Sequence, residues 1–242
     1  MKHTYGLQLY SVRDITENDL GTALKAVKEL GYSSVEFAGF FGNSAADVKA
    51  MLDANGLICA GTHTGIGELK PDVIAETVKY HKAIGNSKII IPGADLGTME
   101  KLEEFCDAVN YAQPILEGNG IMLGYHNHSF EFELMPWGST IHSELEKRTS
   151  LSFQLDTYWA FNAGCDPLST MKRLAGRLCS IHLKDGFKGG KGMALGEGEA
   201  PVKAVRDLAA ELGLPIVVES ETLDPTGIAE VGRCMEYLRS ID

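Results

Sequence analysis

Short runs of β-branched and aromatic residues alternate along the chain with segments in which apolar residues recur every three or four positions. The short runs lie near residues 5–10, 33–37, 57–62, 88–91, 121–126, 151–156, 179–183 and 215–219. Their length and residue types predict β-strands. The segments between them predict two helices that end at Gly31 and Gly56, followed by helices over 70–84, 99–117, 140–148, 166–177, 201–212 and 226–239.

Capping signals mark the ends of the first two helices. Thr16 followed by Asp19 has the spacing of a capping box at the start of the first helix, and Ser44 with Asp47 repeats this spacing in the second. The glycine after each helix suits the C′ position, where the backbone often turns left-handed. Pro114 lies within the segment 99–117 and predicts a kink or a division of that helix.

The alternation of strands and helices predicts the fold class. Strands separated by helices pair in parallel, and eight such units close into a (β/α)8 barrel, known as a TIM barrel, of roughly 250 residues. No linker rich in Pro, Gly or Ser divides the chain, so we expect one domain over residues 1–242. The alternative is an open doubly wound sheet. Its Gly-x-Gly-x-x-Gly fingerprint is missing after the first strand, which favours the closed barrel.

Side chains of a strand point alternately to its two faces, and this parity places the polar residues. In the sixth strand, Leu151, Phe153 and Leu155 share one face, whereas Gln154 and Asp156 share the other. Helices cover the outside of a barrel, so the apolar face must point outward and the polar face inward. Catalytic groups of TIM barrels lie at the carboxyl ends of the strands. The polar residues that end these strands are Gln8, Tyr10, Glu36, His63, His126, His128, Asp156, His182, Glu219 and Glu221.

A mixed set of imidazole nitrogens and carboxylate oxygens at one end of a barrel suits a divalent cation. Mn²⁺, Co²⁺, Zn²⁺ and Fe²⁺ fit such ligands better than Ca²⁺ does. Asp156, His182 and Glu219 end strands that are neighbours in a closed barrel, and closure brings His126 of the fifth strand within reach of the same point. We therefore expect a metal site there.

Structural interpretations stand beside the functional ones. A single inward histidine is more often a hydrogen-bonded core residue than a ligand, and Asp156 could cap a helix that follows Thr157. Lys184 could form a surface pair with Asp185. Trp159 could belong to the core or form an aromatic wall that holds the apolar face of a sugar.

Composition and charge exclude several classes of protein. The 242 residues are 44% apolar and 23% charged, with a net charge of −11, which is typical of a globular protein and argues against nucleic acid as a partner. No apolar run reaches the roughly 20 residues that span a bilayer, and the start lacks the features of a signal peptide. The five cysteines are never spaced as Cys-x-x-Cys. We expect reduced cysteines and a cytoplasmic location.

Six segments resemble the sugar phosphate isomerase/epimerase family of xylose isomerase-like TIM barrels, which is related to inosose dehydratases, ketose 3-epimerases and hydroxypyruvate isomerases. The resemblance covers residues 5–239. The segments are Gly6-Leu7-Gln8-Leu9-Tyr10-Ser11-Val12-Arg13, Val35-Glu36-Phe37, Tyr125-His126-Asn127-His128-Ser129-Phe130-Glu131-Phe132, Asp156-Thr157-Tyr158-Trp159, Ile181-His182-Leu183-Lys184-Asp185 and Val218-Glu219.

The resemblance implies that Asp156, His182 and Glu219 bind the metal. The epimerases have a fourth ligand, a glutamate at the end of strand five, but this sequence has His126 there. Either His126 is the fourth ligand, or Glu131 reaches in from the next loop, or water or substrate fills the position. Glu219 with His126 or Glu131 are then the candidate catalytic bases. The expected substrate-binding residues are Glu36, His63, His128, Trp159 and Lys184.

The implied activity is proton transfer next to a carbonyl, through an enediolate that a divalent metal stabilises. A ketose, a keto-sugar or a sugar phosphate would be epimerised or isomerised, and expulsion of a β-hydroxyl would make the protein a dehydratase-like lyase. The alternatives are a sugar-binding barrel without catalysis and a DNA repair enzyme of the endonuclease IV type, which the negative charge disfavours. The expected partner is a small sugar, with no membrane and with homo-oligomers as a possibility.

Overall fold

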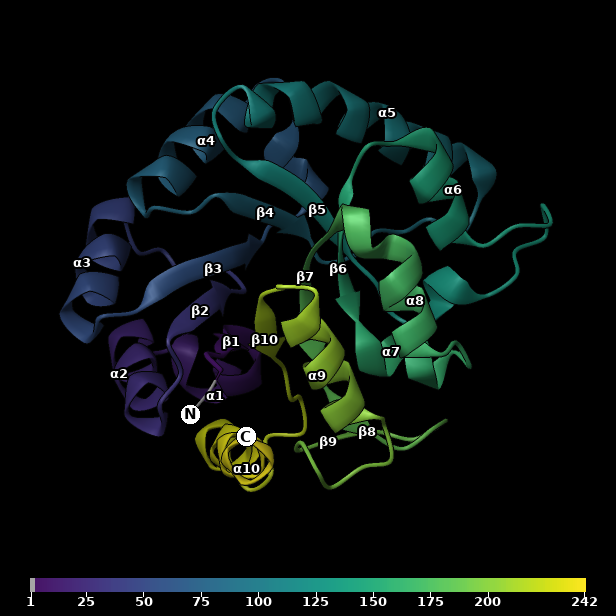
Figure 1. The fold of residues 1–242 in the computed structure, drawn as a ribbon. Helices are drawn as coiled ribbons and strands as arrows, with labels where there is room; N and C mark the ends of the chain where they lie inside the picture. The colour runs from purple at the N-terminus through teal and green to yellow at the C-terminus, as the bar shows by residue number, and fades with distance from the viewer. Residues whose placement is uncertain (1–2) are drawn as a thin grey trace.

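The strands close into an eight-stranded parallel barrel (Figure 1), which confirms the predicted fold class. The structure is a computed structural model that describes residues 3–242. β1 pairs with both β2 and β10, and these pairings close the ring. The barrel strands are β1 (Gly6–Gln8), β2 (Ser34–Phe37), β3 (Ile58–His63), β4 (Lys88–Ile91), β5 (Met122–His126), β6 (Ser152–Asp156), β7 (Leu178–Leu183) and β10 (Ile216–Val218).

Helices surround the barrel, and at least one α-helix follows each barrel strand before the next one begins (Figure 1). The described residues also form four short 3₁₀ helices, which are η1 (Leu9–Val12), η2 (Ile66–Leu69), η3 (Phe130–Phe132) and η4 (Ala175–Arg177). The α-helices are α1 (Arg13–Thr16), α2 (Leu20–Leu30), α3 (Ala45–Asn55), α4 (Ile74–Ala83), α5 (Met99–Glu117), α6 (Ile141–Arg148), α7 (Thr157–Asn162), α8 (Pro167–Leu174), α9 (Val202–Glu211) and α10 (Gly227–Ile241). No helix within residues 3–242 is long and apolar enough to cross a bilayer.

Local signals set most helix ends, and one prediction about them is wrong. Ser44 caps α3 by accepting a hydrogen bond from the Asp47 N–H, as its spacing predicts. Thr16 does not cap α2. It ends the short helix α1, and Asp19 is the capping residue, which accepts from the Thr22 N–H. Pro114 lies near the end of α5, and the helix continues through it to Glu117.

The two faces of the strands have the predicted character. The outward residues are apolar and pack against the helices, as Leu155, Ile181 and Val218 do, each fully buried. The inward face carries a polar layer in which the Gln154 side chain donates hydrogen bonds to Glu36 and Ser180. Burial of apolar surface on the outer face therefore holds the strands in a register that presents polar groups to the barrel interior.

The connection between β7 and α9 folds onto the Asp185 carboxylate. Two short strands, β8 (Asp185–Gly186) and β9 (Gly192–Met193), form an antiparallel pair there. The Asp185 side chain accepts hydrogen bonds from four backbone N–H groups, those of Gly186, Gly196, Gly198 and Ala200. Asp185 therefore does not form a surface pair with Lys184. It holds a glycine-rich segment in one conformation beside the barrel.

Candidate metal centre

Four side chains from neighbouring strands converge at the carboxyl end of the barrel. His126 ends β5, Asp156 ends β6, His182 lies in β7 and Glu219 directly follows β10. All four are buried, and each offers a ligand atom within 4.8 Å of the others. Strand register produces this convergence, because Asp156 is the direct partner of His182 and His182 is the direct partner of Val217. These are the residues that the sequence predicts as metal ligands.

The two carboxylate oxygens of Asp156 have different surroundings. Its Oδ1 accepts a hydrogen bond of 2.8 Å from the Trp159 N–H and so caps α7. Its Oδ2 is buried without a hydrogen-bond partner. The capping interpretation and the ligand interpretation of Asp156 are thus both compatible with this geometry. Asn127, which sequence reasoning did not single out, fixes the Asp156 backbone by donating to its carbonyl and accepting from its N–H.

His126 is the group in the cluster with the fewest interactions. Both of its ring nitrogens are buried and have no hydrogen-bond partner, and its Nε2 lies 3.6 Å from Asp156 Oδ2. Burial, aided by the positive charge of His182, holds the pKa of His126 well below its usual value, so the ring is neutral. Buried polar atoms without partners are costly. A cation between His126 Nε2 and Asp156 Oδ2 would give both of these atoms a partner, so these residues fit a bound metal.

His182 contacts two carboxylates through its two ring nitrogens. Nε2 lies 2.7 Å from Glu36 Oε1, and Nδ1 lies 3.2 Å from Glu219 Oε2. Burial alone would lower the pKa of His182, but the two carboxylates outweigh it and raise the pKa to about 10. The same contacts, with Lys184, hold the pKa of Glu219 well below its usual range against the effect of burial. The centre therefore already gathers negative charge around a positive group.

Glu36 lies in the polar layer beneath the cluster. It is fully buried and accepts hydrogen bonds from Gln8 at 2.7 Å and Gln154 at 2.6 Å, besides its contact with His182. The His63 Nε2 is 3.1 Å from Glu36 Oε1. Burial would raise the pKa of Glu36, but the charges of His182 and His63 lower it well below its usual range. The structure thus places Glu36 against His182, whereas the sequence suggests a contact with substrate.

A cavity of about 470 Å³ opens above the cluster, and we call it the mouth cavity. His126 and Glu219 reach it from below, and His63 and His128 line its sides. Burial lowers the pKa of His128 to about 4, so this ring is neutral as well. Two cluster residues and two of the predicted substrate-binding residues therefore share one cavity. Its other lining residues are Tyr10, Ala38, Gly39, Pro92 and Glu221.

Lys184 and Trp159 lie together beside the cluster. The Lys184 Nζ is 2.8 Å from Glu221 Oε1 and 3.5 Å from Glu219 Oε2, and it lies 4.6 Å from the centre of the Trp159 ring. Lys184 is buried, and these carboxylates keep its pKa raised although burial lowers it. The structure thus pairs Lys184 with Glu219 and Glu221. Neither Lys184 nor Trp159 is part of the mouth cavity's lining.

Glu131 lies outside the cluster. Its carboxylate accepts hydrogen bonds from the Tyr125 hydroxyl at 2.8 Å and from the His128 N–H at 2.7 Å. Tyr125 belongs to the outward face of β5 and packs in the core. Burial raises the pKa of Glu131 to about 7. The structure therefore brings His126, and not Glu131, together with Asp156, His182 and Glu219.

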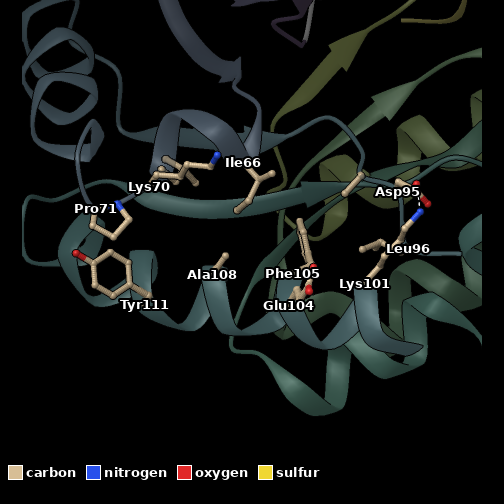
Figure 2. A pocket seen from close by; sticks show the side chains of 12 residues that line it. Ile66, Lys70, Pro71, Asp95, Leu96, Lys101, Glu104, Phe105, Ala108 and Tyr111 are labelled. Atoms are coloured by element: carbon tan, nitrogen blue, oxygen red, sulfur yellow. Dashed lines mark hydrogen bonds and ion pairs between the residues drawn. The ribbon is translucent and has the colours of Figure 1, made fainter. Parts of the chain in front are cut away.

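An apolar cavity of about 530 Å³ lies elsewhere on the molecule, between η2 and α5 (Figure 2). Figure 2 shows Phe105 and Tyr111 of α5 facing Ile66 and Pro71 across it. It contains none of the cluster residues, and charged groups such as Lys101, which pairs with Asp95, lie at its edge. The mouth cavity is therefore the candidate site for chemistry.

Comparison with known proteins agrees with the fold. A family model described as xylose isomerase-like TIM barrel matches residues 24–241. The chain belongs to this family. A search of the curated proteins gives no match.

Solved structures of xylose isomerase-like barrels align over nearly the whole chain. A sugar phosphate isomerase/epimerase from Parabacteroides distasonis is 25% identical, with a TM-score of 0.85 and coverage of 98% of both chains. A probable 3-DHS dehydratase from Bacillus anthracis is 11% identical, with a TM-score of 0.75 and coverage of 98% of this chain and 99% of that chain. A family 2 AP endonuclease from Brucella melitensis is 14% identical, with a TM-score of 0.76 and coverage of 97% of this chain and 98% of that chain. At such identities the last two show a shared fold alone.

Proposed function

We propose that the protein is a metal-dependent isomerase or epimerase that transfers a proton next to the carbonyl of a ketose or keto-sugar. The observation that carries this proposal is the buried cluster at the base of the mouth cavity, in which Asp156 Oδ2 and both nitrogens of His126 lack partners. The similarity to a solved sugar phosphate isomerase/epimerase supports the choice of substrate class.

Asp156, His182, Glu219 and His126 would hold the cation. Carboxylate oxygens and imidazole nitrogens in this number suit Mn²⁺, Co²⁺, Zn²⁺ or Fe²⁺. Such an ion, when bound, supplies Lewis-acid stabilisation of negative charge on a carbonyl oxygen. The His182 Nε2 lies 2.7 Å from Glu36 Oε1, so Nε2 would keep its proton and donate to Glu36 when a cation displaces the proton from Nδ1. A carboxylate that accepts from the other ring nitrogen of a metal-binding histidine fixes the tautomer of that histidine and orients its ring.

Glu219 and His126 are the candidate groups that exchange a proton with the substrate. Both line the mouth cavity. Glu219 is ionised and His126 is neutral, because of their pKa shifts. The second oxygen of Glu219 can accept a proton while the first holds the cation, whereas the single lone pair of His126 can serve only one of the two roles at a time. Glu131 is committed to Tyr125 and the His128 backbone, so we assign it the positioning of His128. His63 and His128 would contact the hydroxyl groups of the substrate.

The test is incorporation of solvent deuterium into substrate. Protein loaded with Mn²⁺ is incubated in D₂O with a panel of ketoses and inososes, and the carbon-bound deuterium is measured by NMR. We expect exchange next to the carbonyl of at least one ketose, and its loss by 100-fold or more in Glu219→Gln. Glu211→Gln at the exposed end of α9 serves as the control and should exchange at the normal rate.

Other outcomes would reassign the function. Loss of water from an inosose would identify a lyase, which uses the same proton abstraction followed by expulsion of a β-hydroxyl. Binding of a sugar with no exchange across the panel would identify a sugar-binding barrel. Metal-dependent cleavage of abasic DNA would identify the repair activity named in the structure from Brucella melitensis.

A further inference from the structure

A second cavity, which we call the side cavity, adjoins the mouth cavity. It has a volume of about 570 Å³ and lies between α4 and the loops that follow β2 and β3. His63 and Gly39 line both cavities, so the two share a wall at the polar end of the barrel. A cavity of a few hundred Å³ accommodates a small ligand. The side cavity therefore offers room next to the cluster for a further part of a substrate.

The most buried polar residue that lines the side cavity is His81, which is 2% exposed. Its tautomer follows from its neighbours. Asn86 donates to the Lys88 carbonyl through Nδ2 and accepts from the Lys88 N–H through Oδ1, which fixes the orientation of the amide. The Asn86 Nδ2 lies 2.9 Å from His81 Nδ1. Because this amide nitrogen donates, Nδ1 accepts, and the proton of neutral His81 is on Nε2.

The Nε2–H of His81 is a donor without a partner among the described residues. The residue is 2% exposed and lines the side cavity, and its side-chain hydrogen bonds to Thr62 and Asn86 both involve Nδ1. Burial lowers the pKa of His81 to about 4, so the ring is uncharged at neutral pH. The floor of the side cavity thus presents one neutral donor, which suits an uncharged acceptor such as a sugar hydroxyl.

The charges around the two cavities disfavour an anion. No Lys or Arg is among the residues that line either of them. Glu68, Asp72 and Glu76 lie at the edge of the side cavity, and only Glu76 has a cationic partner there, the exposed Lys79. The buried cations of the cluster already have carboxylate partners, since His182 contacts Glu36 and Glu219, and Lys184 contacts Glu219 and Glu221. A phosphate or carboxylate in the side cavity would meet like charge, and no cationic side chain lines that cavity to compensate it.

Aromatic side chains supply the apolar part of the side cavity. The rings of Phe40 and Tyr80 both line it, and their centres are 4.4 Å apart. An aromatic surface with a few directed polar groups is typical of sites for small polar ligands. Aromatic rings, one neutral donor and peripheral carboxylates together match a hydroxyl-rich, uncharged ring.

We propose that the side cavity is a subsite for a second, uncharged sugar unit, so that the substrate is a neutral keto-disaccharide or glycoside rather than a sugar phosphate. Its keto unit would occupy the mouth cavity, and its second unit would extend past His63 towards His81. This inference rests on the proposed function for the mouth cavity, which it makes more specific.

Two glycines allow a test in which only the side cavity is blocked. A Cβ atom at Gly65 or at Gly67 meets no atom within 4 Å, and neither residue has a positive φ. Gly65 lines the side cavity, whereas Gly67 does not. Gly65→Trp should therefore fill the cavity, and Gly67→Trp is the matched control. Neither residue lines the mouth cavity.

Affinities are measured by calorimetry with Mn²⁺ present, for fructose, fructose 6-phosphate and the neutral keto-disaccharides lactulose, turanose and palatinose. We expect at least one disaccharide to bind the wild-type protein tenfold or more tightly than fructose does. Gly65→Trp should remove this advantage without changing fructose binding, and Gly67→Trp should keep it. Fructose 6-phosphate should bind no more tightly than fructose.

Three results would overturn the proposal. It is wrong if no disaccharide binds more tightly than fructose, if fructose 6-phosphate binds best, or if Gly65→Trp retains the advantage of the disaccharide. Exchange of deuterium into fructose with no preference for disaccharides would refute the subsite and leave the proposed function intact. A disaccharide preference that Gly65→Trp removes, without exchange of any substrate, would support the subsite and refute the catalysis.

Discussion

At the scale of single residues, the contact between Glu36 and His182 decides how the cluster can act. A histidine binds a cation through a lone pair, so the proton must be on the other nitrogen. The Glu36 carboxylate lies within hydrogen-bond distance of the His182 Nε2. The side-chain amides of Gln8 and Gln154 donate hydrogen bonds to the same carboxylate and keep it in place. Glu36 is therefore a positioning residue whose negative charge favours the ligand tautomer of His182.

We predict that Glu36→Gln weakens Mn²⁺ binding about 10- to 100-fold, the usual range for loss of an outer-shell partner. The amide keeps the size of the side chain but loses the charge, and its NH₂ group faces donors from Gln8 and Gln154. The measurement is the Mn²⁺ dissociation constant by calorimetry, with circular dichroism as the check on folding.

The control for this prediction is Glu131→Gln, which also replaces a buried carboxylate but lies outside the cluster. Its Mn²⁺ affinity should equal that of the wild type, whereas His126→Ala should weaken binding. The opposite pattern would make Glu131 the fourth ligand. A Glu36→Gln protein that binds Mn²⁺ within twofold of the wild type would contradict the positioning role.

The alternation of polar and apolar residues along each strand predicts which of these residues point inward, but not what each one contacts. His126, Asp156 and His182 alternate with apolar outward neighbours, and this pattern is enough to place them inside a barrel. Glu36 has the same parity, yet its partners depend on how far each strand is shifted along its neighbours. The alternation of inward and outward residues does not indicate a role for Asn127, because this residue follows His126, the last inward residue of β5, where the alternation ends. Register and loop geometry arise only on closure.

At the scale of elements, α4 is tied to the barrel through a buried polar group. His81 is in its last turn, and the Asn86 amide links it to β4 by bonding both backbone groups of Lys88. Thr62 of β3 lies 3.3 Å from the same His81 nitrogen. The helix therefore depends on His81 remaining neutral, since a proton on Nδ1 would face the Asn86 donor.

We predict that acid weakens this connection. The pKa of folded His81 is about 4, below the ordinary value of 6.5, so the unfolded chain takes up the proton first. The contribution of neutral His81 to the stability of the folded protein is complete above about pH 7, and it is lost as the pH falls from 6.5 towards 4. Between pH 7 and pH 5 the loss amounts to about 2 kcal/mol in the free energy of unfolding. Urea unfolding at the two pH values measures it.

The variant His81→Gln can accept from Asn86 but does not titrate, so its change in stability between pH 7 and pH 5 should be smaller by about that 2 kcal/mol. Tyr80→Phe, on the same helix, is the control. It removes the hydroxyl that donates to Asn43 but leaves His81 in place, so it should keep the wild-type pH dependence. Equal pH dependence in His81→Gln and the wild type would show that His81 is not the group responsible.

At the scale of the whole molecule, closure of the barrel and assembly of the site are one event. β1 joins β2 to β10, so strands from the two ends of the sequence meet, and the Tyr5 hydroxyl also donates to Asp242 near the chain end. The cluster draws its groups from β5, β6, β7 and the segment after β10. A cation bound there would connect the second half of the barrel to the strand that closes it.

We therefore predict that Mn²⁺ stabilises the whole fold and not one loop. At 100 times the dissociation constant, a ligand that binds only the folded state adds about 2.7 kcal/mol to the free energy of unfolding. For a chain of this size that corresponds to a rise of about 5–10 °C in Tm. Glu219→Ala and His182→Ala should lose the rise, and His126→Ala should keep part of it. Glu211→Ala, at an exposed site on α9, should show the full rise. A full rise in Glu219→Ala would place the cation elsewhere in the molecule.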